Sequence, residues 1–363
     1  LVGSEMCIRD SLLGVRSRTQ VTPKVVAERG ETLTAVGAFC IGTNQLALDD
    51  LAHAGVAAFN APFSNTRSVV ELVISEIIAL ARRLGDRNTQ MHHGVWRKSA
   101  IGSHEVRGRT LGIVGYGNIG AQISVLAEAL GLSVMYYDVA DKLPMGNAHR
   151  CDSLEELLQS VDVVTVHVDG RADNKLLFGE QEFSMMRPRS LFLNLSRGHV
   201  VDVAALADNL RTGHLAGAAV DVYPSEPRSG DEPFVSELQS LDNVILTPHV
   251  GGSTQEAQID IGRYVAGKLI DYSERASTSM SVNLPDITTG ATPGARIGHL
   301  HLNMPGIMAD LNRLVADHGG NVTYQALATR GELGYTVLDI DETDRELLVD
   351  VTRLEGTIRA RVL

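Results

Sequence analysis

The stretch TLGIVGYGNIG, at residues 110–120, decides the expected fold. Its apolar, partly β-branched start predicts a strand over Leu111–Val114, and the residues after it predict a helix over Ile119–Leu130. Two glycines, Gly115 and Gly117, lie between the strand and the helix, and a third, Gly120, is in the first turn of the helix. Glycines in this pattern permit a tight turn, the close approach of a pyrophosphate and close packing of the helix on the strand. Without further context the same pattern also occurs in simple turns.

Asp138 supplies that context. It follows the next predicted strand, Ser133–Tyr137, about eighteen residues beyond the last glycine of the pattern. A carboxylate at this strand end accepts hydrogen bonds from the ribose hydroxyls of an adenosine and repels a 2′-phosphate, which favours NAD over NADP. The alternative is an aspartate that caps a helix.

Short apolar runs alternate with helical runs between about Thr110 and Val250, as in a doubly wound parallel sheet. A second helix is expected over Ser153–Gln159. Further strands are expected over Val161–His167, Leu191–Leu195, Ala218–Val220 and Val244–Leu246. We therefore predict an α/β domain of the Rossmann type, with six parallel strands and a nucleotide bound at their carboxyl ends.

The composition excludes several classes of protein. The chain has 363 residues, 44% of them hydrophobic and 21% charged, which allows a sizeable core and two or three domains. A formal net charge of -12 argues against a general binder of nucleic acid or of anionic membranes. The most apolar helical run, Val69–Ala81, carries Glu71 and Glu76 and is too short to span a bilayer.

The cysteines indicate a compartment. They are few and scattered, without the paired spacing of metal ligands: Cys7, Cys40 and Cys151. This pattern favours a reducing compartment, with the cytoplasm as the expected location, over a disulfide framework. No metal site is expected.

An arginine, a glutamate and a histidine follow predicted strands and together suggest a hydride-transfer site. Arg197 comes after Leu191–Leu195, and its guanidinium can hold a substrate carboxylate with two parallel hydrogen bonds. Gly198 relieves crowding beside it. The alternative for Arg197 is a surface ion pair.

His249 follows the strand Val244–Leu246 and is the candidate acid or base, because imidazole moves protons near neutral pH. Glu226 lies between Pro224 and Pro227, which limit where its side chain can point. A carboxylate next to the imidazole would favour the protonated ring and fix its tautomer. The alternatives are a structural histidine and an isolated loop glutamate.

Four longer motifs carry a resemblance to a known family. They are FCIGTNQ at residues 39–45, NAPFSNTRS at 60–68, NLSRG at 194–198 and TPHVGGST at 247–254. With these motifs almost the whole chain resembles the D-isomer-specific 2-hydroxyacid dehydrogenases, and among them the members that act on 3-phosphoglycerate. The resemblance implies NAD-dependent oxidation of 3-phospho-D-glycerate to 3-phosphohydroxypyruvate, the first step of L-serine biosynthesis.

The resemblance also implies roles for individual residues. Arg197 would bind the substrate carboxylate and polarise the carbonyl, His249 would be the acid or base, and Glu226 would tune it. Asp221 would bind the nicotinamide amide. The implied cofactor contacts are Gly115, Gly117, Asn118, Ile119, Gly120, Asp138, Leu195, Ser196, Arg197, Asp221, His249, Val250, Gly251 and Gly252. The implied substrate contacts are Arg16, Arg18, Asn44 and Lys98. A phosphate pocket would include the two arginines, for which a solvated strand end is the alternative.

The resemblance divides the chain into domains. Residues 1–64 and 252–285 would form a flavodoxin-like substrate-binding domain that is incomplete at its N-terminus. Residues 65–251 would form the NAD-binding domain and 286–296 a linker. Residues 297–363 would form a ferredoxin-like α+β ACT domain, with elements in the order β-α-β-β-α-β.

The terminal domain implies regulation. L-serine is the expected feedback inhibitor, bound between paired ACT domains, and its implied contacts are His301, Asn303 and Asn321. For the asparagines, turn capping is the alternative. Inhibition at a distance requires that serine bind one arrangement of the subunits better than another.

Trp96, the only tryptophan, suggests an oligomer. Its segment resembles one that the family uses to lock one subunit into its neighbour, which implies a homotetramer. Lys98 would then reach the neighbour's phosphate pocket. Buried packing within one chain is the alternative for a single tryptophan.

Two other functions stay open. One is a dehydrogenase of an unphosphorylated 2-hydroxy acid, for which loss of Arg16 and Arg18 should matter little. The other is a non-catalytic sensor of NAD or of an amino acid, against which the intact set of Arg197, Glu226 and His249 counts.

Overall fold

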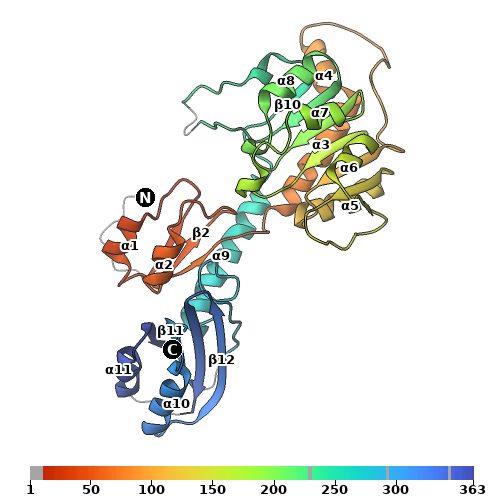
Figure 1. Ribbon diagram of the computed structural model, residues 1–363. Coiled ribbons are helices and arrows are strands. Elements are labelled where there is room, and N and C mark those ends of the chain that lie inside the picture. The colour runs from red at the N-terminus through yellow and green to blue at the C-terminus, as the bar shows by residue number, and fades with distance from the viewer. Residues whose placement is uncertain (1–10, 228–230, 292–293, 342–344) are drawn as a thin grey trace. The chain divides into compact units, whose positions relative to one another are not determined.

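A computed structural model describes residues 11–227, 231–291, 294–341 and 345–363. The chain divides into two compact units, one of residues Asn65–Ala257 and the other of the chain before and after that segment (Figure 1). Each unit is described by itself. Cys7, the first ten residues of the expected substrate-binding domain and part of the expected linker lie outside the described residues.

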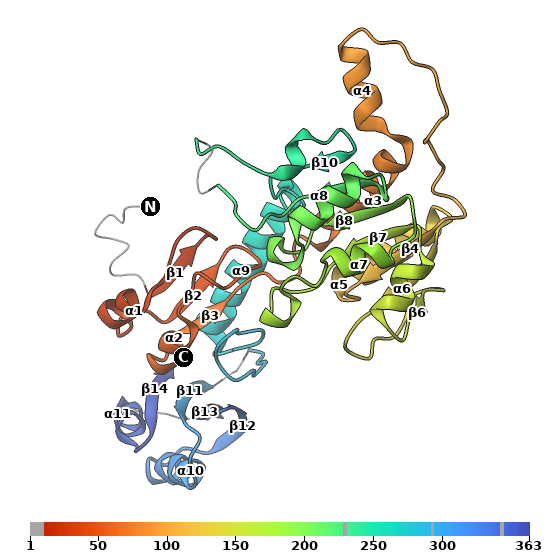
Figure 2. The same ribbon diagram turned by 45° about the horizontal axis from the view of Figure 1, so that its top comes forward.

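The unit Asn65–Ala257 contains a seven-stranded parallel sheet in the order β10-β9-β8-β7-β4-β5-β6 (Figure 2). The strands are β4 (Thr110–Val114), β5 (Ser133–Tyr137), β6 (His149–Arg150), β7 (Val163–Val166), β8 (Ser190–Asn194), β9 (Leu215–Val220) and β10 (Val244–Leu246). The predicted doubly wound parallel sheet is confirmed. The predicted count of six strands is wrong, because β6 adds a short edge strand. Its two residues are polar and exposed, so no apolar run marks them in the sequence.

Helices cover both faces of this sheet. They are α3 (Thr66–Arg82), α5 (Asn118–Ala129), α6 (Leu154–Ser160), α7 (Glu180–Met185) and α8 (Val203–Arg211). Helix α4 (Leu84–His92) follows α3, has no buried residue and contributes to neither face. Successive side chains of a strand point to opposite faces, so Leu191 and Leu193 join one core while Phe192 joins the other. The first core contains α3 and α5, and the second contains α6, α7 and α8.

The second unit begins with a three-stranded parallel sheet in the order β1-β2-β3. Its elements are β1 (Leu12–Val15), α1 (Pro23–Arg29), β2 (Ala35–Ala38), α2 (Leu48–His53) and β3 (Ala57–Phe59). The long helix α9 (Gln255–Arg275) packs against β2 at Gly37. A Cβ atom at Gly37 would lie 2.6 Å from Val265 Cγ1, so only glycine allows the helix to approach this closely.

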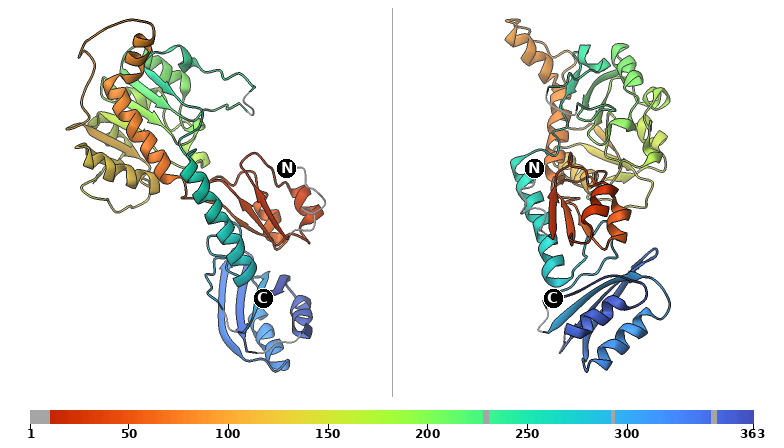
Figure 3. Two further views of the ribbon diagram at one scale, coloured as in Figure 1. Left: turned by 180° about the vertical axis from the view of Figure 1, so that it is seen from behind. Right: turned by 90° about the vertical axis from the view of Figure 1, so that its left-hand side faces the viewer.

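The C-terminal part of the second unit forms an antiparallel sheet in the order β12-β13-β11-β14, with two helices on one face (Figures 2 and 3). Its elements are β11 (Ala295–Leu302), α10 (Ile307–Asp317), β12 (Val322–Arg330), β13 (Leu333–Ile340), α11 (Arg345–Arg353) and β14 (Thr357–Val362). This is the predicted β-α-β-β-α-β order. A buried ion pair between Arg296 Nε and Asp339 Oδ1, at 2.6 Å, ties β11 to β13.

Within the described residues, no helix combines the length and the apolar character needed to cross a bilayer.

Candidate active site

The ends of three neighbouring strands build the candidate site. Asn194 at the end of β8 lies opposite Val220 of β9, and Val220 lies opposite Leu246 of β10. Arg197 lies three residues after the end of β8, and His249 lies three residues after the end of β10. Adjacent strands lie about 4.8 Å apart, so these segments leave the sheet side by side at its carboxyl edge. This is the edge at which doubly wound sheets bind ligands.

The side chain of Asn194 shapes the turn that carries Arg197. Its Oδ1 accepts hydrogen bonds from the amide and the hydroxyl of Ser196, at 3.1 and 2.8 Å, and its Nδ2 donates to the Arg197 carbonyl at 3.1 Å. Gly198 then passes the backbone of Tyr223 so closely that any Cβ would overlap it. Arg197 itself is exposed, and its guanidinium donates to the Ser196 carbonyl at 2.7 Å.

His249 and Glu226 form a hydrogen-bonded pair. His249 Nδ1 lies 2.9 Å from Glu226 Oε2 and 3.0 Å from Oε1, with side chains 51% and 38% exposed. Glu226 Oε1 also accepts from the Tyr223 amide at 3.2 Å, so the loop holds the carboxylate in place. His249 has a φ of 54°, in the left-handed region that non-glycine residues rarely adopt. The structure therefore brings the predicted acid or base together with its predicted carboxylate.

Asp221 anchors the loop that carries His249. Its carboxylate is 2% exposed and accepts three hydrogen bonds: from Thr247 Oγ1 at 2.5 Å and from the amides of Val250 and Gly251, each at 2.8 Å. These bonds join the end of β9 to the turn after β10. Asp221 was expected to bind the nicotinamide amide, and in the structure its carboxylate lies beneath this turn.

The glycine turn after β4 has the geometry that a dinucleotide needs. Gly115 has a φ of 93°, and a Cβ there would lie 2.7 Å from the carbonyl oxygen of His167. Gly120 packs against the Gly115 carbonyl with no room for a side chain. Gly117 instead faces open space, and no side chain caps the first amides of α5 behind it. An open, uncapped helix start is a place where a pyrophosphate fits.

Asp138 holds this turn. Its Oδ2 accepts from the Tyr116 amide at 2.7 Å and its Oδ1 from the Ala140 amide at 2.8 Å. Each carboxylate oxygen keeps a second lone pair, so Asp138 can still accept from a ribose hydroxyl. The remaining predicted cofactor contacts lie in the same unit, with Leu195, Ser196 and Gly251 buried and Asn118 and Val250 exposed; Ile119 and Gly252 are partly buried.

Three predicted substrate contacts lie in the other unit. Arg16 and Arg18 follow β1, and Asn44 lies in the loop after β2, so all three belong to the carboxyl edge of the small parallel sheet. All are exposed. Arg16 donates to Gln258 Oε1 at 3.0 Å. Lys98 belongs to the nucleotide-binding unit and is exposed beside Trp96.

Trp96 is 80% exposed. The alternative of buried packing within one chain is therefore wrong for this residue. A large apolar surface left in solvent is typical of a contact with another chain.

The three predicted serine contacts lie in different settings. His301 is 1% exposed, and both ring nitrogens have partners, the Leu302 carbonyl at 2.8 Å and Thr336 Oγ1 at 3.1 Å. The ring lies across Gly334 of β13, where a side chain would collide with it. Asn303 and Asn321 are exposed at the two ends of the segment that contains α10.

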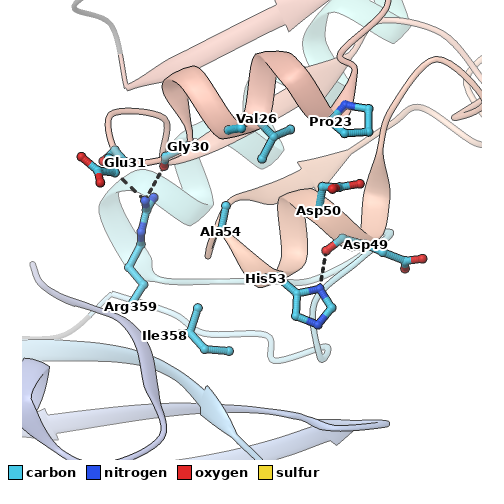
Figure 4. Close-up of a pocket in the computed structure, with 11 residues that line it drawn as sticks. Pro23, Val26, Gly30, Glu31, Asp49, Asp50, His53, Ala54, Ile358 and Arg359 are labelled. Atoms are coloured by element: carbon cyan, nitrogen blue, oxygen red, sulfur yellow. Dashed lines mark hydrogen bonds between the residues drawn. The ribbon is translucent and has the colours of Figure 1, made fainter.

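An open cavity of about 650 Å³ lies elsewhere in the second unit (Figure 4). Its lining includes Glu31, Asp49, Asp50, His53 and Arg359, and none of the predicted site residues. The Arg359 guanidinium donates to the carbonyls of Gly30 and Leu33, which ties β14 to the loop after α1. We assign no ligand to this cavity.

Two features of the site were not foreseen from the sequence. Tyr223 lies under the loop with its hydroxyl 2.8 Å from the Val220 carbonyl and 3.0 Å from the Thr247 carbonyl. Glu76 is buried on α3, and its place in an otherwise apolar helical face was the only available signal. Among the residues with described positions, no group of three or more His, Cys, Asp or Glu side chains is arranged to hold a metal.

Comparisons with known proteins identify relatives of this chain. Residues 74–251 match the NAD-binding domain of the D-isomer specific 2-hydroxyacid dehydrogenases, and residues 297–359 match an AHAS small subunit-like ACT domain. The chain is 49% identical to D-3-phosphoglycerate dehydrogenase of Escherichia coli over 98% of its own length and 88% of that protein. It is 47% identical to the enzyme of the same name from Dictyostelium discoideum, over 97% and 86%.

A solved structure shares the fold at low identity. D-2-hydroxyisocaproate dehydrogenase superimposes with a TM-score of 0.71 at 23% identity, over 77% of this chain and 88% of that one.

Proposed function

The chain belongs to the D-isomer-specific 2-hydroxyacid dehydrogenase family, among the D-3-phosphoglycerate dehydrogenases, and from this premise we propose how its residues carry out the reaction. The proposed reaction is the oxidation of 3-phospho-D-glycerate to 3-phosphohydroxypyruvate with NAD, the first step of L-serine biosynthesis. The hydrogen-bonded pair of His249 and Glu226, at the same sheet edge as Arg197, carries the proposal.

His249 takes the proton of the substrate hydroxyl in the oxidation. Because Nδ1 is bonded to the Glu226 carboxylate, that nitrogen carries the ring proton and Nε2 keeps its lone pair for the substrate. The carboxylate then stabilises the imidazolium that forms. In the reverse direction the same ring donates the proton to the carbonyl oxygen.

Arg197 holds the substrate carboxylate and polarises the carbonyl as it forms. Its exposed guanidinium has donors to spare beyond the bond to the Ser196 carbonyl. NAD, when bound, accepts the hydride that leaves C2 of the substrate. The open start of α5 at Gly117 and the carboxylate of Asp138 are the proposed contacts for its pyrophosphate and ribose.

Arg16 and Arg18, with Asn44, are the proposed contacts of the substrate's phosphate. Two exposed guanidiniums at the carboxyl edge of a parallel sheet support this role, because arginine binds phosphate with paired hydrogen bonds. A dehydrogenase of an unphosphorylated 2-hydroxy acid would not need them.

The regulatory proposals are L-serine as ligand of the ACT domain and a homotetramer as the assembly. Exposed Asn303 and Asn321 support the first, and the exposed Trp96 supports the second, with Lys98 reaching the phosphate of a neighbouring subunit. A cytoplasmic location is supported by Cys40 and Cys151, which are free thiols in the described part of the chain.

NADH formation tests the function directly. We expect a rise in NADH absorbance with 3-phospho-D-glycerate that far exceeds the rise with glycerate, and little rise for His249→Asn. The double variant Arg16→Ala, Arg18→Ala should raise KM for the phosphorylated substrate only. Equal rates with both substrates would reject the phosphate assignment, and full activity of His249→Asn would reject the catalytic one. Titration with L-serine in the same assay tests the regulation.

A further inference from the structure

Glu76 is a buried carboxyl group that the proposed mechanism does not use. It is 3% exposed, and neither of its oxygens has a hydrogen-bond partner. Its neighbours on the same face of α3, four and three residues away, are the apolar Leu72 and Val73. A carboxyl group in such a setting costs free energy, so its position calls for an explanation.

The contacts of α3 place Glu76 against the strand that leads to Asp221. Near the start of the helix, Val69 Cγ2 lies beside Gly251, whose Cα also faces Asp221 Oδ2. Near its end, Leu80 lies beside Gly217, at the start of β9. Glu76 lies between these two contacts on the same helical face, and therefore over the part of β9 that ends at Asp221.

Among the charged groups on the elements packed against α3, Asp221 is the one that faces Glu76. Strands β8, β9 and β10 carry no ionisable residue. On α5 the only charged residue is Glu128, which accepts from the Asn147 amide. On α4, Asp86 pairs with Arg83, Arg87 donates to Gln90 and to the Ser99 carbonyl, and His92 is exposed. Tyr223 is the remaining ionisable group nearby, and burial raises its pKa, so it stays neutral.

Two negative charges in this space would repel each other. The carboxylate of Asp221 accepts hydrogen bonds from a hydroxyl and two amides. Burial, and secondarily the charge of Asp221, raise the pKa of Glu76 to about 8. Glu76 is therefore protonated at neutral pH and ionises in the mildly alkaline range.

We propose that Glu76 is a positioning residue, which as a neutral carboxyl leaves the Asp221 anchor of the His249 turn undisturbed and on ionising weakens it. Ionisation of Glu76 releases one proton to water and requires no other reactant. The link to catalysis rests on the proposed function, whereas the protonation state and the anchor do not.

Infrared spectroscopy tests the protonation state. Wild-type protein should show a neutral-carboxyl band at pH 7 that disappears with a midpoint near pH 8. The band should be absent in Glu76→Gln and in Glu76→Met, and present in Glu71→Gln. Glu71 is the matched control, because it lies on the same helix but is exposed and paired with Arg67. No such band in the wild type, or its persistence in both Glu76 variants, would overturn the proposal.

The coupling to the His249 turn is tested by NADH affinity, from fluorescence titration between pH 6 and 9.5. Wild type and Glu71→Gln should lose affinity above about pH 8, and Glu76→Gln and Glu76→Met should lack that step while binding normally at pH 7. The kcat/KM profile should show the same step. If the pH profiles of the Glu76 variants match that of the wild type, the positioning role is wrong, even when the neutral-carboxyl band is present in the wild type. If phosphoglycerate is not a substrate, the infrared band still reports the protonation of Glu76 and the NADH titration still reports its coupling to the His249 turn.

Discussion

Replacement of Glu226 by glutamine tests the proposed proton transfer most directly. The substitution keeps the size of the side chain and its acceptor oxygen, and removes the charge that stabilises the imidazolium of His249. A hydrogen bond to a charged group is worth about 1.5–3 kcal/mol. The two side chains are 38% and 51% exposed, so solvent screening puts this pair near the lower limit. Since each 1.36 kcal/mol is a factor of ten, we expect kcat to fall roughly tenfold to thirtyfold.

The assay is initial-rate NADH formation at saturating substrate, with Glu237→Gln as control. Glu237 is an exposed glutamate of the following segment and has no part in the site. A double-mutant cycle sharpens the result: in the His249→Asn background, loss of the Glu226 charge should cost almost nothing further. A kcat within twofold of the wild type, or equal losses in both backgrounds, would refute the idea that Glu226 acts through His249.

Three more predictions concern the turns and the terminal domain. Gly198→Ala should lower the melting temperature and abolish activity, because a Cβ would overlap Tyr223, whereas Gly117→Ala should leave the melting temperature unchanged and weaken NADH binding, because Gly117 faces open space; equal melting temperatures for the two variants would contradict this. Asp138→Ala should lower the ratio of kcat/KM with NAD to that with NADP, and an unchanged ratio would count against Asp138 as the ribose contact. Burial lowers the pKa of His299 to about 3, below the 6.5 of the unfolded chain, so the unfolded state binds more protons between these values. Stability should therefore fall as the pH drops from about 6.5 towards 3, and His299→Gln should flatten that slope in a urea titration at several pH values; an unchanged slope would show that another group is responsible.

The sequence was most informative at the ends of strands. Parallel strands share one carboxyl edge, so residues placed just after three apolar runs had to meet, and Arg197, Glu226 and His249 do follow neighbouring strands. The glycine pattern also predicted the tight turn after β4, because the positions of Gly115 and Gly120 leave no room for side chains. These features depend on short stretches of sequence, so they can be predicted from one sequence alone.

Features that depend on packing between distant segments could not be predicted. The edge strand β6 forms because β5 offers a free edge to two polar residues. The burial of His301 depends on Gly334, more than thirty residues away on β13. Glu76 was noted only as a charge within an apolar run, and its relation to Asp221 appears once α3 lies on β9. The exposure of Trp96 likewise follows from the path of a long loop, which composition does not fix.

The left-handed backbone at His249 sets stability against activity at that position. For a non-glycine residue this conformation costs about 1–2 kcal/mol of folding free energy, and glycine avoids that cost. We therefore expect His249→Gly to melt at a higher temperature than the wild type while it cannot turn over substrate. Under the proposed mechanism, thermal robustness and proton transfer therefore make opposite demands on this position.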